Sequence, residues 1–172
     1  MGELVLLTGG ARSGKSRWAA QMAEEGMPPV TFVATAQVSD EEMRARIQRH
    51  QAERPPSWRT VEEATDLTRV FDMEGLHGTV LVDCLTIYVS NHLLAGHLEE
   101  QILDHMRQVC ELVKKASFRV IVVTNEVGWG IVPEHPLGRR FRDVAGLANQ
   151  LVAEYADEVY LVVSGIPVRI KP

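Results

Sequence analysis

A glycine-rich segment early in the chain has residue types and spacing suited to binding phosphate. Residues 9–16 read Gly-Gly-Ala-Arg-Ser-Gly-Lys-Ser and match the pattern G-x-x-x-x-G-K-[ST], between an apolar run and a helix-forming stretch. Glycines let the backbone turn so that successive N–H groups converge on an anion, which the positive end of the following helix also attracts. The pattern predicts a phosphate-binding loop (P-loop) for GTP or ATP; the alternative is a turn that binds nothing. The predicted contacts are Gly9, Gly10, Ala11, Arg12, Ser13, Gly14, Lys15 and Ser16.

Two polar side chains of this loop and one acid further along predict a magnesium site. Lys15 is expected to reach the β- and γ-phosphates, and the Ser16 hydroxyl is expected to ligate Mg²⁺. The apolar run 79–83 ends in Asp83, and an acid at the end of a neighbouring strand often holds that cation directly or through water. The alternative for Asp83 is a capping or turn role at the start of the next element.

A histidine is placed where chemistry on the nucleotide is conceivable. Ser39 is predicted to cap a helix, with Glu42 three residues later completing a capping box, and this helix should end before Pro55-Pro56. On this helix His50 lies one turn beyond Ile47, on the inward face. Taken alone, a histidine there fits a packing or surface role as well as a chemical one.

The segment 124–133 is a second candidate for ligand contact. An apolar run leads into Thr-Asn-Glu-Val-Gly-Trp-Gly-Ile-Val-Pro, a polar stretch broken by glycines. Parallel sheets bind ligands beyond the carboxyl ends of their strands, which is where such a loop would lie. An ordinary connecting loop is the alternative.

The elements that must position these residues alternate along the chain. Short apolar runs, typical of strands covered on both faces, alternate with amphipathic helical segments. This pattern predicts an α/β fold in one domain, residues 1–172: a three-layer P-loop NTPase of the RecA-like type, with a mainly parallel sheet and an antiparallel C-terminal edge strand. The predicted strands are 4–8, 30–34, 79–83, 119–124, 158–163 and 168–170. The other predicted helices are 15–25, 98–116 and 137–155, and we interpret the apolar stripes of the last two as core.

Composition excludes several classes of protein. The net charge is −5, and basic residues are interspersed with acids, so a nucleic-acid surface is not expected. The apolar runs are much shorter than the ~20 residues of a membrane-spanning helix, and no signal peptide or lipid anchor is predicted. Cys84 and Cys110 have neither metal-type spacing nor disulfide density, which favours a reducing, cytoplasmic setting.

Several segments together resemble a known family. They follow one another in order over nearly the whole chain, and the most specific are the extended P-loop and the Asn-Glu-Val-Gly motif at 125–128. On these residues the sequence is similar to the bifunctional adenosylcobinamide kinase / adenosylcobinamide-phosphate guanylyltransferase family. The matching segments are 8–17, 34–36, 40–47 with His50, 58–62, 124–134, 141–150 and 157–167.

The resemblance implies a two-step enzyme of cobalamin assembly. A nucleoside triphosphate would first phosphorylate the hydroxyl of the aminopropanol arm of adenosylcobinamide. GTP would then donate GMP to that phosphate, giving adenosylcobinamide-GDP and pyrophosphate. The resemblance also implies a homotrimer, with adenosylcobinamide, GTP and ATP as its small-molecule partners and Mg²⁺ as cofactor.

The family uses a histidine to carry GMP, and the matching residue here is His50. Where members have a second histidine just before the carrier, this chain has Arg49, which leaves His50 as the single candidate. Neutral imidazole is nucleophilic near neutral pH because the ordinary pKa of histidine is about 6.5. The further nucleotide contacts that the resemblance implies are Ala34, Thr35, Ala36, Gln51, Ala52, Glu53, Arg54, Glu62 and Asp83.

Other interpretations remain open from the residues themselves. A simple small-molecule kinase would use the P-loop without guanylyl transfer, and a nucleotide-dependent switch would use it without consuming a corrinoid. Glu62 fits a contact to guanine or ribose, or a solvated acid. One further hypothesis places Tyr88, Asn91 and His92 at the corrinoid site.

Overall fold

A twisted sheet of seven strands forms the centre of the protein, in the order β3-β2-β4-β5-β1-β6-β7. The computed structural model describes residues 2–52 and 54–171. Strands β1 to β6 are all parallel, and β7 pairs antiparallel with β6. The strands are β1 (Glu3–Gly9), β2 (Val30–Ala34), β3 (Arg59–Glu62), β4 (Thr79–Asp83), β5 (Arg119–Val123), β6 (Glu158–Val163) and β7 (Ile166–Lys171).

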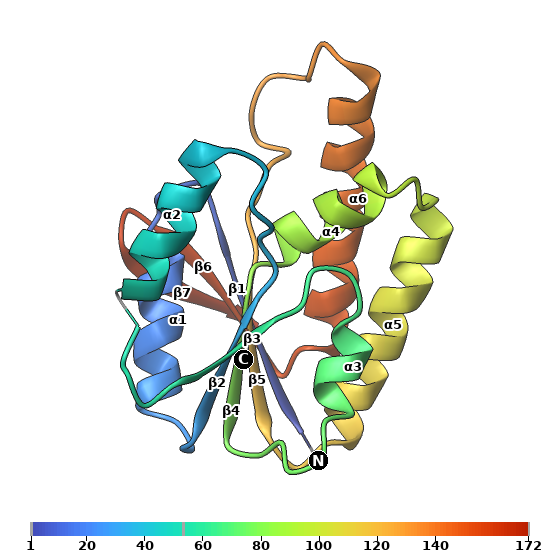
Figure 1. The fold of residues 1–172 in the computed structure, drawn as a ribbon. Coiled ribbons are helices and arrows are strands. Elements are labelled where there is room, and N and C mark those ends of the chain that lie inside the picture. The colour runs from blue at the N-terminus through green and yellow to red at the C-terminus, as the bar shows by residue number, and fades with distance from the viewer. Residues whose placement is uncertain (1, 53, 172) are drawn as a thin grey trace.

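Helices cover both faces of this sheet, which gives the three layers that the sequence predicts. Helices α1 and α2 lie on one side and α3, α4, α5 and α6 on the other (Figure 1). The helices are α1 (Lys15–Glu24), α2 (Glu41–Ala52), α3 (Leu67–Phe71), α4 (Leu85–Leu94), α5 (Glu99–Lys115) and α6 (Pro136–Tyr155). In the described part of the chain, no helix combines the length and apolar character needed to cross a bilayer.

The predicted strands and long helices are confirmed, with local corrections. The strand 59–62 was not predicted because it is a short edge strand, mostly exposed, without an apolar run. The helices α3 and α4 were also missed. The N-cap of α2 is Asp40 rather than Ser39: Asp40 Oδ1 accepts a hydrogen bond of 2.8 Å from the backbone N–H of Met43. The carboxylate of Asp40 lies one residue nearer the helix and takes the position predicted for the Ser39 hydroxyl.

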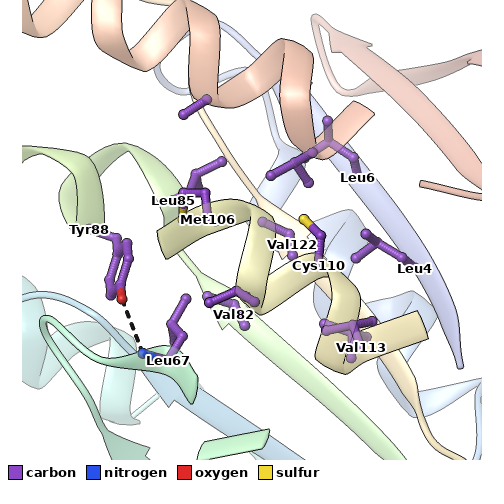
Figure 2. Close-up of a cluster of buried hydrophobic side chains, with 14 of the residues drawn as sticks. Leu4, Leu6, Leu67, Val82, Leu85, Tyr88, Met106, Cys110, Val113 and Val122 are labelled. Carbon is purple, nitrogen blue, oxygen red and sulfur yellow. Dashed lines mark hydrogen bonds between the residues drawn. The ribbon is translucent and has the colours of Figure 1, made fainter. Parts of the chain in front are cut away.

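The larger core cluster fills the space between the sheet and α3 to α6. Figure 2 shows side chains of β1 and β4 packing against Met106, Cys110 and Val113 of α5. The apolar stripes of α5 and α6 are largely buried, as the sequence predicts, including Ile102, Met106, Val144 and Ala148. A second cluster packs α1 against the other face of the sheet.

Tyr88 belongs to this core and does not reach the surface, so the hypothesis that it contacts a corrinoid is wrong. It is 0% exposed, and its hydroxyl accepts a hydrogen bond of 3.0 Å from the backbone N–H of Leu67 (Figure 2). His92 is also buried. Asn91 is half-buried and donates to the carbonyl oxygens of Thr35 and Ala64.

A cluster of three histidines lies where α4 and α5 meet. His92 and His97 face each other with their Nδ1 atoms 2.8 Å apart, and His105 Nε2 lies 2.6 Å from the Tyr88 hydroxyl. Burial, with the neighbouring histidines, lowers the pKa of His92 to about 4, and burial lowers the pKa of His105 as well. Both side chains are therefore neutral in the folded protein near pH 7.

We predict that Met106→Ala lowers the free energy of unfolding by about 2–5 kcal/mol, because it leaves a cavity in the larger core cluster. Gln108→Ala, on the exposed face of the same helix, should change it by less than about 0.5 kcal/mol. Urea denaturation measures both. Equal effects of the two substitutions would contradict the packing described above.

We also predict that acid destabilises the protein through His92. Because the pKa of His92 is about 4 when folded and 6.5 in its ordinary state, the unfolded chain binds the extra proton between these values. The stability that neutral His92 provides is complete above pH 6.5 and is lost as the pH falls toward 4. Urea denaturation across this range should show a shallower pH dependence for His92→Gln than for wild type. His77→Gln, an exposed histidine, is the control, and identical slopes in all three proteins would refute the prediction.

Candidate active site

One large cavity of about 1430 Å³ opens at the carboxyl ends of β1, β2, β4 and β5. Residues from distant parts of the sequence line it, and most of those predicted from the sequence are among them. The predicted residues in its lining are Ala11, Arg12, Ser13, Gly14, Lys15, Ser16, Ala34, Ala36, His50, Arg54, Glu62 and Asp83. The predicted residues Gly9, Gly10, Thr35, Gln51 and Ala52 are absent from this lining. Glu53 lies outside the described residues.

The P-loop forms the tight turn between β1 and α1. Gly14 has a φ of 95°, in the left-handed region that suits glycine, and it is the N-cap of α1. The Ser13 carbonyl accepts a hydrogen bond of 2.8 Å from the backbone N–H of Gly165, in the turn between β6 and β7. Trp18 Nε1 donates to the Gly165 carbonyl at 2.8 Å. The turn after β6 therefore braces the P-loop from the side, a contact that the sequence analysis did not predict.

Lys15 and Asp83 supply the charges closest to the loop. Lys15 is buried, its Nζ donates to the Gly10 carbonyl at 2.8 Å, and burial lowers its pKa. Burial raises the pKa of Asp83, while the charge of His50, a hydrogen bond from Ser16 and the charges of Lys15 and Arg54 oppose the rise. All four of these side chains line the cavity together with Asp83.

The pair formed by Ser16 and Asp83 fits a magnesium ion. Mg²⁺ keeps several waters and usually takes only one or two protein ligands when phosphates supply the others. A hydroxyl and a carboxylate that line the same cavity, beside a phosphate-binding turn, are that donor set. Among the described residues, no group of three or more His, Cys, Asp or Glu side chains is arranged to hold a metal without phosphate.

An aromatic and ionic wall closes the β2–β3 side of the cavity. The Arg54 guanidinium lies 3.6 Å from the centre of the Phe32 ring, and Phe32 stacks on Trp58 with centroids 6.3 Å apart. Burial lowers the pKa of Arg54, and the charges of Asp83 and Glu62 partly offset this. Glu62, at the end of β3, also lines the cavity. A planar guanidinium beside a carboxylate is suited to a planar base with N–H donors.

The helix α2 turns one face toward this cavity. Met43, Ile47 and His50 lie at helical spacing and all line it, and the imidazole of His50 is exposed. No described residue of α2 is fully buried. The apolar side of this helix therefore meets the cavity instead of a packed core.

Thr35 has a structural role instead of a place in the cavity wall. It is 0% exposed, and its Oγ1 donates to the Cys84 carbonyl and accepts from the Cys84 N–H, both at 2.8 Å. These bonds join the segments that follow β2 and β4. Thr35 thereby holds the carboxyl ends of β2 and β4 together, next to Asp83.

Asn125 and Glu126 line the cavity, in agreement with segment 124–133 as a candidate for ligand contact, although no individual role was predicted for either residue. The signals for them were a polar loop directly after an apolar strand and the Asn-Glu-Val-Gly motif. Glu126 lies next to β1, where the Thr8 hydroxyl donates to its Oε1 at 2.6 Å.

Comparison with known proteins gives a consistent match along the whole chain. A family model described as cobinamide kinase / cobinamide phosphate guanyltransferase matches residues 5–170. The chain is 42% identical to the bifunctional adenosylcobalamin biosynthesis protein CobU of Salmonella typhimurium, over 98% of this chain and 99% of that protein. It is 43% identical to the corresponding protein CobP of Pseudomonas aeruginosa, over 96% of each.

Solved structures agree on the fold. A KaiC-like protein from Pyrococcus horikoshii covers 92% of this chain, which covers 70% of it, with a TM-score of 0.52 and 18% identity. An ATPase of a bacterial type III secretion system covers 94% of this chain, which covers 51% of it, with a TM-score of 0.58 and 14% identity. At these identities the likeness concerns the fold alone, and it confirms the predicted fold class.

We predict that Gly14→Ala weakens nucleotide binding about tenfold, because a side chain in the left-handed region costs roughly 1–2 kcal/mol. The added Cβ would also lie 3.2 Å from Gly165 Cα, against the turn that braces the loop. Titration calorimetry with GTP and Mg²⁺ measures the change. The control is Gly146→Ala in α6, where a Cβ meets no heavy atom within 4 Å. Wild-type affinity in Gly14→Ala would contradict the proposed binding geometry.

Proposed function

Because the chain belongs to the cobinamide kinase / cobinamide phosphate guanyltransferase family, we propose that both reactions of that family take place in the cavity beside the P-loop. The protein is a bifunctional enzyme of adenosylcobalamin biosynthesis. It phosphorylates adenosylcobinamide with a nucleoside triphosphate and then transfers GMP from GTP to the new phosphate, giving adenosylcobinamide-GDP. Placing both reactions in one cavity requires that it hold a triphosphate, a nucleophile and the acceptor arm.

In our proposal the backbone N–H groups of the P-loop donate hydrogen bonds to the triphosphate, and Lys15 neutralises charge on its β- and γ-phosphates. Backbone N–H groups and a lysine placed where charge develops lower the barrier most when water is excluded, and Lys15 is buried. Mg²⁺, when bound by Ser16 and Asp83, would polarise the phosphates and stabilise the leaving pyrophosphate.

We further propose that His50 carries the GMP group. A ring nitrogen of neutral His50 attacks the α-phosphorus, forming a nitrogen–phosphorus bond, and the bond to the bridging oxygen breaks to release pyrophosphate. A phosphate oxygen of the acceptor then attacks the same phosphorus and releases the imidazole. The observation that supports this most directly is that His50 lines the same cavity as Lys15 and Ser16.

The wall formed by Arg54, Phe32 and Glu62 is proposed to receive the guanine base. A carboxylate can accept two N–H bonds from guanine, which adenine does not offer in the same arrangement. Ala34 and Ala36 would leave room beside it, with Gln51 and Ala52 at the edge. The contacts assigned to Gly9, Gly10 and Thr35 would be made through the backbone.

Family membership also supports a cytoplasmic homotrimer, which we include in the proposal. The edge strand β7 exposes apolar side chains, among them Ile166 at 64% and Ile170 at 57%. Exposed apolar surface of this kind is often covered by another subunit.

The main alternative, a kinase without guanylyl transfer, predicts no covalent adduct. With Mg²⁺ and GTP labelled at the α-phosphate, we expect the wild-type chain to form an acid-labile, alkali-stable labelled adduct. His50→Asn should lose this adduct completely, while phosphorylation of adenosylcobinamide by γ-labelled nucleotide stays within about threefold of wild type because the P-loop is intact.

His77→Asn is the control, because His77 is exposed in the loop before β4, at the opposite end of that strand from Asp83. It should be labelled like the wild type. Label that survives in His50→Asn would exclude His50 as the carrier, and an unlabelled wild type would exclude the covalent mechanism altogether.

A further inference from the structure

The order of the strands places the end of β5 at a particular point of the site. Strand β5 lies between β4, which ends in Asp83, and β1, which leads into the P-loop. The residues that follow β5 therefore emerge between the proposed magnesium ligand and the phosphate-binding turn. Glu126 is one of them; its backbone N–H donates to the Gly9 carbonyl at 3.0 Å, and its side chain lines the cavity.

The carboxylate of Glu126 is held by one oxygen. Its Oε1 accepts hydrogen bonds from the Thr8 hydroxyl at 2.6 Å and from Asn149 Nδ2 at 3.3 Å. Thr8 and Asn149 are both buried, whereas Glu126 is half-buried. Within residues 2–52 and 54–171, Oε2 takes part in no hydrogen bond. One oxygen thus fixes the group, and the other oxygen of this cavity-lining residue is free of hydrogen bonds in the described part of the chain.

A buried polar network fixes Asn149 in turn. Its Oδ1 accepts from the Thr124 hydroxyl at 2.7 Å, and its Nδ2 also donates to the Asn125 carbonyl at 3.2 Å. The Thr86 hydroxyl accepts from the backbone N–H of Asn125 at 2.7 Å. These bonds join α4, α6 and the loop after β5, so the position of the carboxylate is set by several rigid elements.

Glu126 places a carboxylate beside the phosphate-binding turn. None of the ion pairs formed by the described residues includes it, although it lies beside a turn built to bind anions. An uncompensated carboxylate there repels phosphate, so a purely structural role would be served better by an amide. Glu63, another acid of the cavity, is also held by one oxygen, but it follows the edge strand β3 and not the strand next to β1.

We propose that Glu126 is the general base of the kinase step, an inference that rests on the proposed function. Its Oε2 accepts the proton of the acceptor hydroxyl as that oxygen forms a bond to the γ-phosphorus. The bond between the γ-phosphorus and the bridging oxygen breaks, and the nucleoside diphosphate leaves with that electron pair. Thr8 and Asn149 are positioning residues. Guanylyl transfer does not need this base, because its acceptor is already an ionised phosphate.

The test is to measure the two reactions separately in Glu126→Gln, which keeps the shape of the side chain and removes the proton acceptor. We expect phosphorylation of adenosylcobinamide to fall by about 10²–10⁴-fold in kcat, the usual range for loss of a general base. Labelling of the protein by α-labelled GTP, and transfer of GMP to adenosylcobinamide phosphate, should stay within about threefold. Glu134→Gln, an exposed acid of the same loop, should leave both reactions at the wild-type rate.

Two further measurements distinguish a base from a structural residue. The wild-type kinase rate should fall in acid as a carboxylate takes up its proton, and this fall should be absent from the residual rate of Glu126→Gln. Glu126→Asp, which keeps a proton acceptor on a shorter side chain, should recover part of the rate and cover the case in which the glutamine variant folds poorly.

The outcomes separate this proposal from the one on which it rests. Wild-type kinase activity in Glu126→Gln would overturn it, and so would equal loss of both reactions in a variant that melts at the wild-type temperature. A wild-type chain that does not phosphorylate adenosylcobinamide would instead refute the kinase reaction itself. Loss of the adduct in His50→Asn alone concerns guanylyl transfer and leaves Glu126 unaffected.

Discussion

The backbone N–H groups of the turn between β1 and α1 provide the interaction on which the rest of the site depends. They can converge on a phosphate only if the turn keeps its shape, and its shape depends on residues at the other end of the sequence. Trp18 and Gly165, 147 positions apart, are joined by a hydrogen bond, and Gly165 also donates to Ser13. The antiparallel strand β7, at the edge of the sheet, therefore contributes to the active site through the turn that precedes it.

The proposed chemistry is distributed on two sides of that turn. His50 comes from α2, whose described residues are not packed into a core, whereas Glu126 is fixed by a network of buried side chains. This difference agrees with their proposed tasks. A group carrier exchanges bonds with two different partners, while a general base must hold one oxygen at a fixed place relative to one hydroxyl.

In the cavity, burial as well as attraction between opposite charges determines how stable the charged forms of the side chains are. Burial raises the pKa of Asp83 and lowers that of Lys15, so each group is less stable in its charged form when no ligand is present. A bound triphosphate with Mg²⁺ would reverse both tendencies, because the phosphates favour the lysine cation and the metal favours the carboxylate. Nucleotide binding and the charge state of the site are thus expected to be coupled.

The sequence by itself determined the features that depend on residues close to one another along the chain. The P-loop motif, the buried strands and the amphipathic helices α5 and α6 are local patterns, and a phosphate-binding turn between a strand and a helix can be identified from them alone. The resemblance to a family added His50 and the base-binding residues. The tertiary structure decided which of these share one cavity, because Lys15, His50 and Asp83 come from three elements whose proximity depends on the order of the strands. It also decided the bond of Thr8 to Glu126, the brace from Gly165 and the histidine cluster of α4 and α5, which are contacts across the sheet and between helices that no local periodicity encodes.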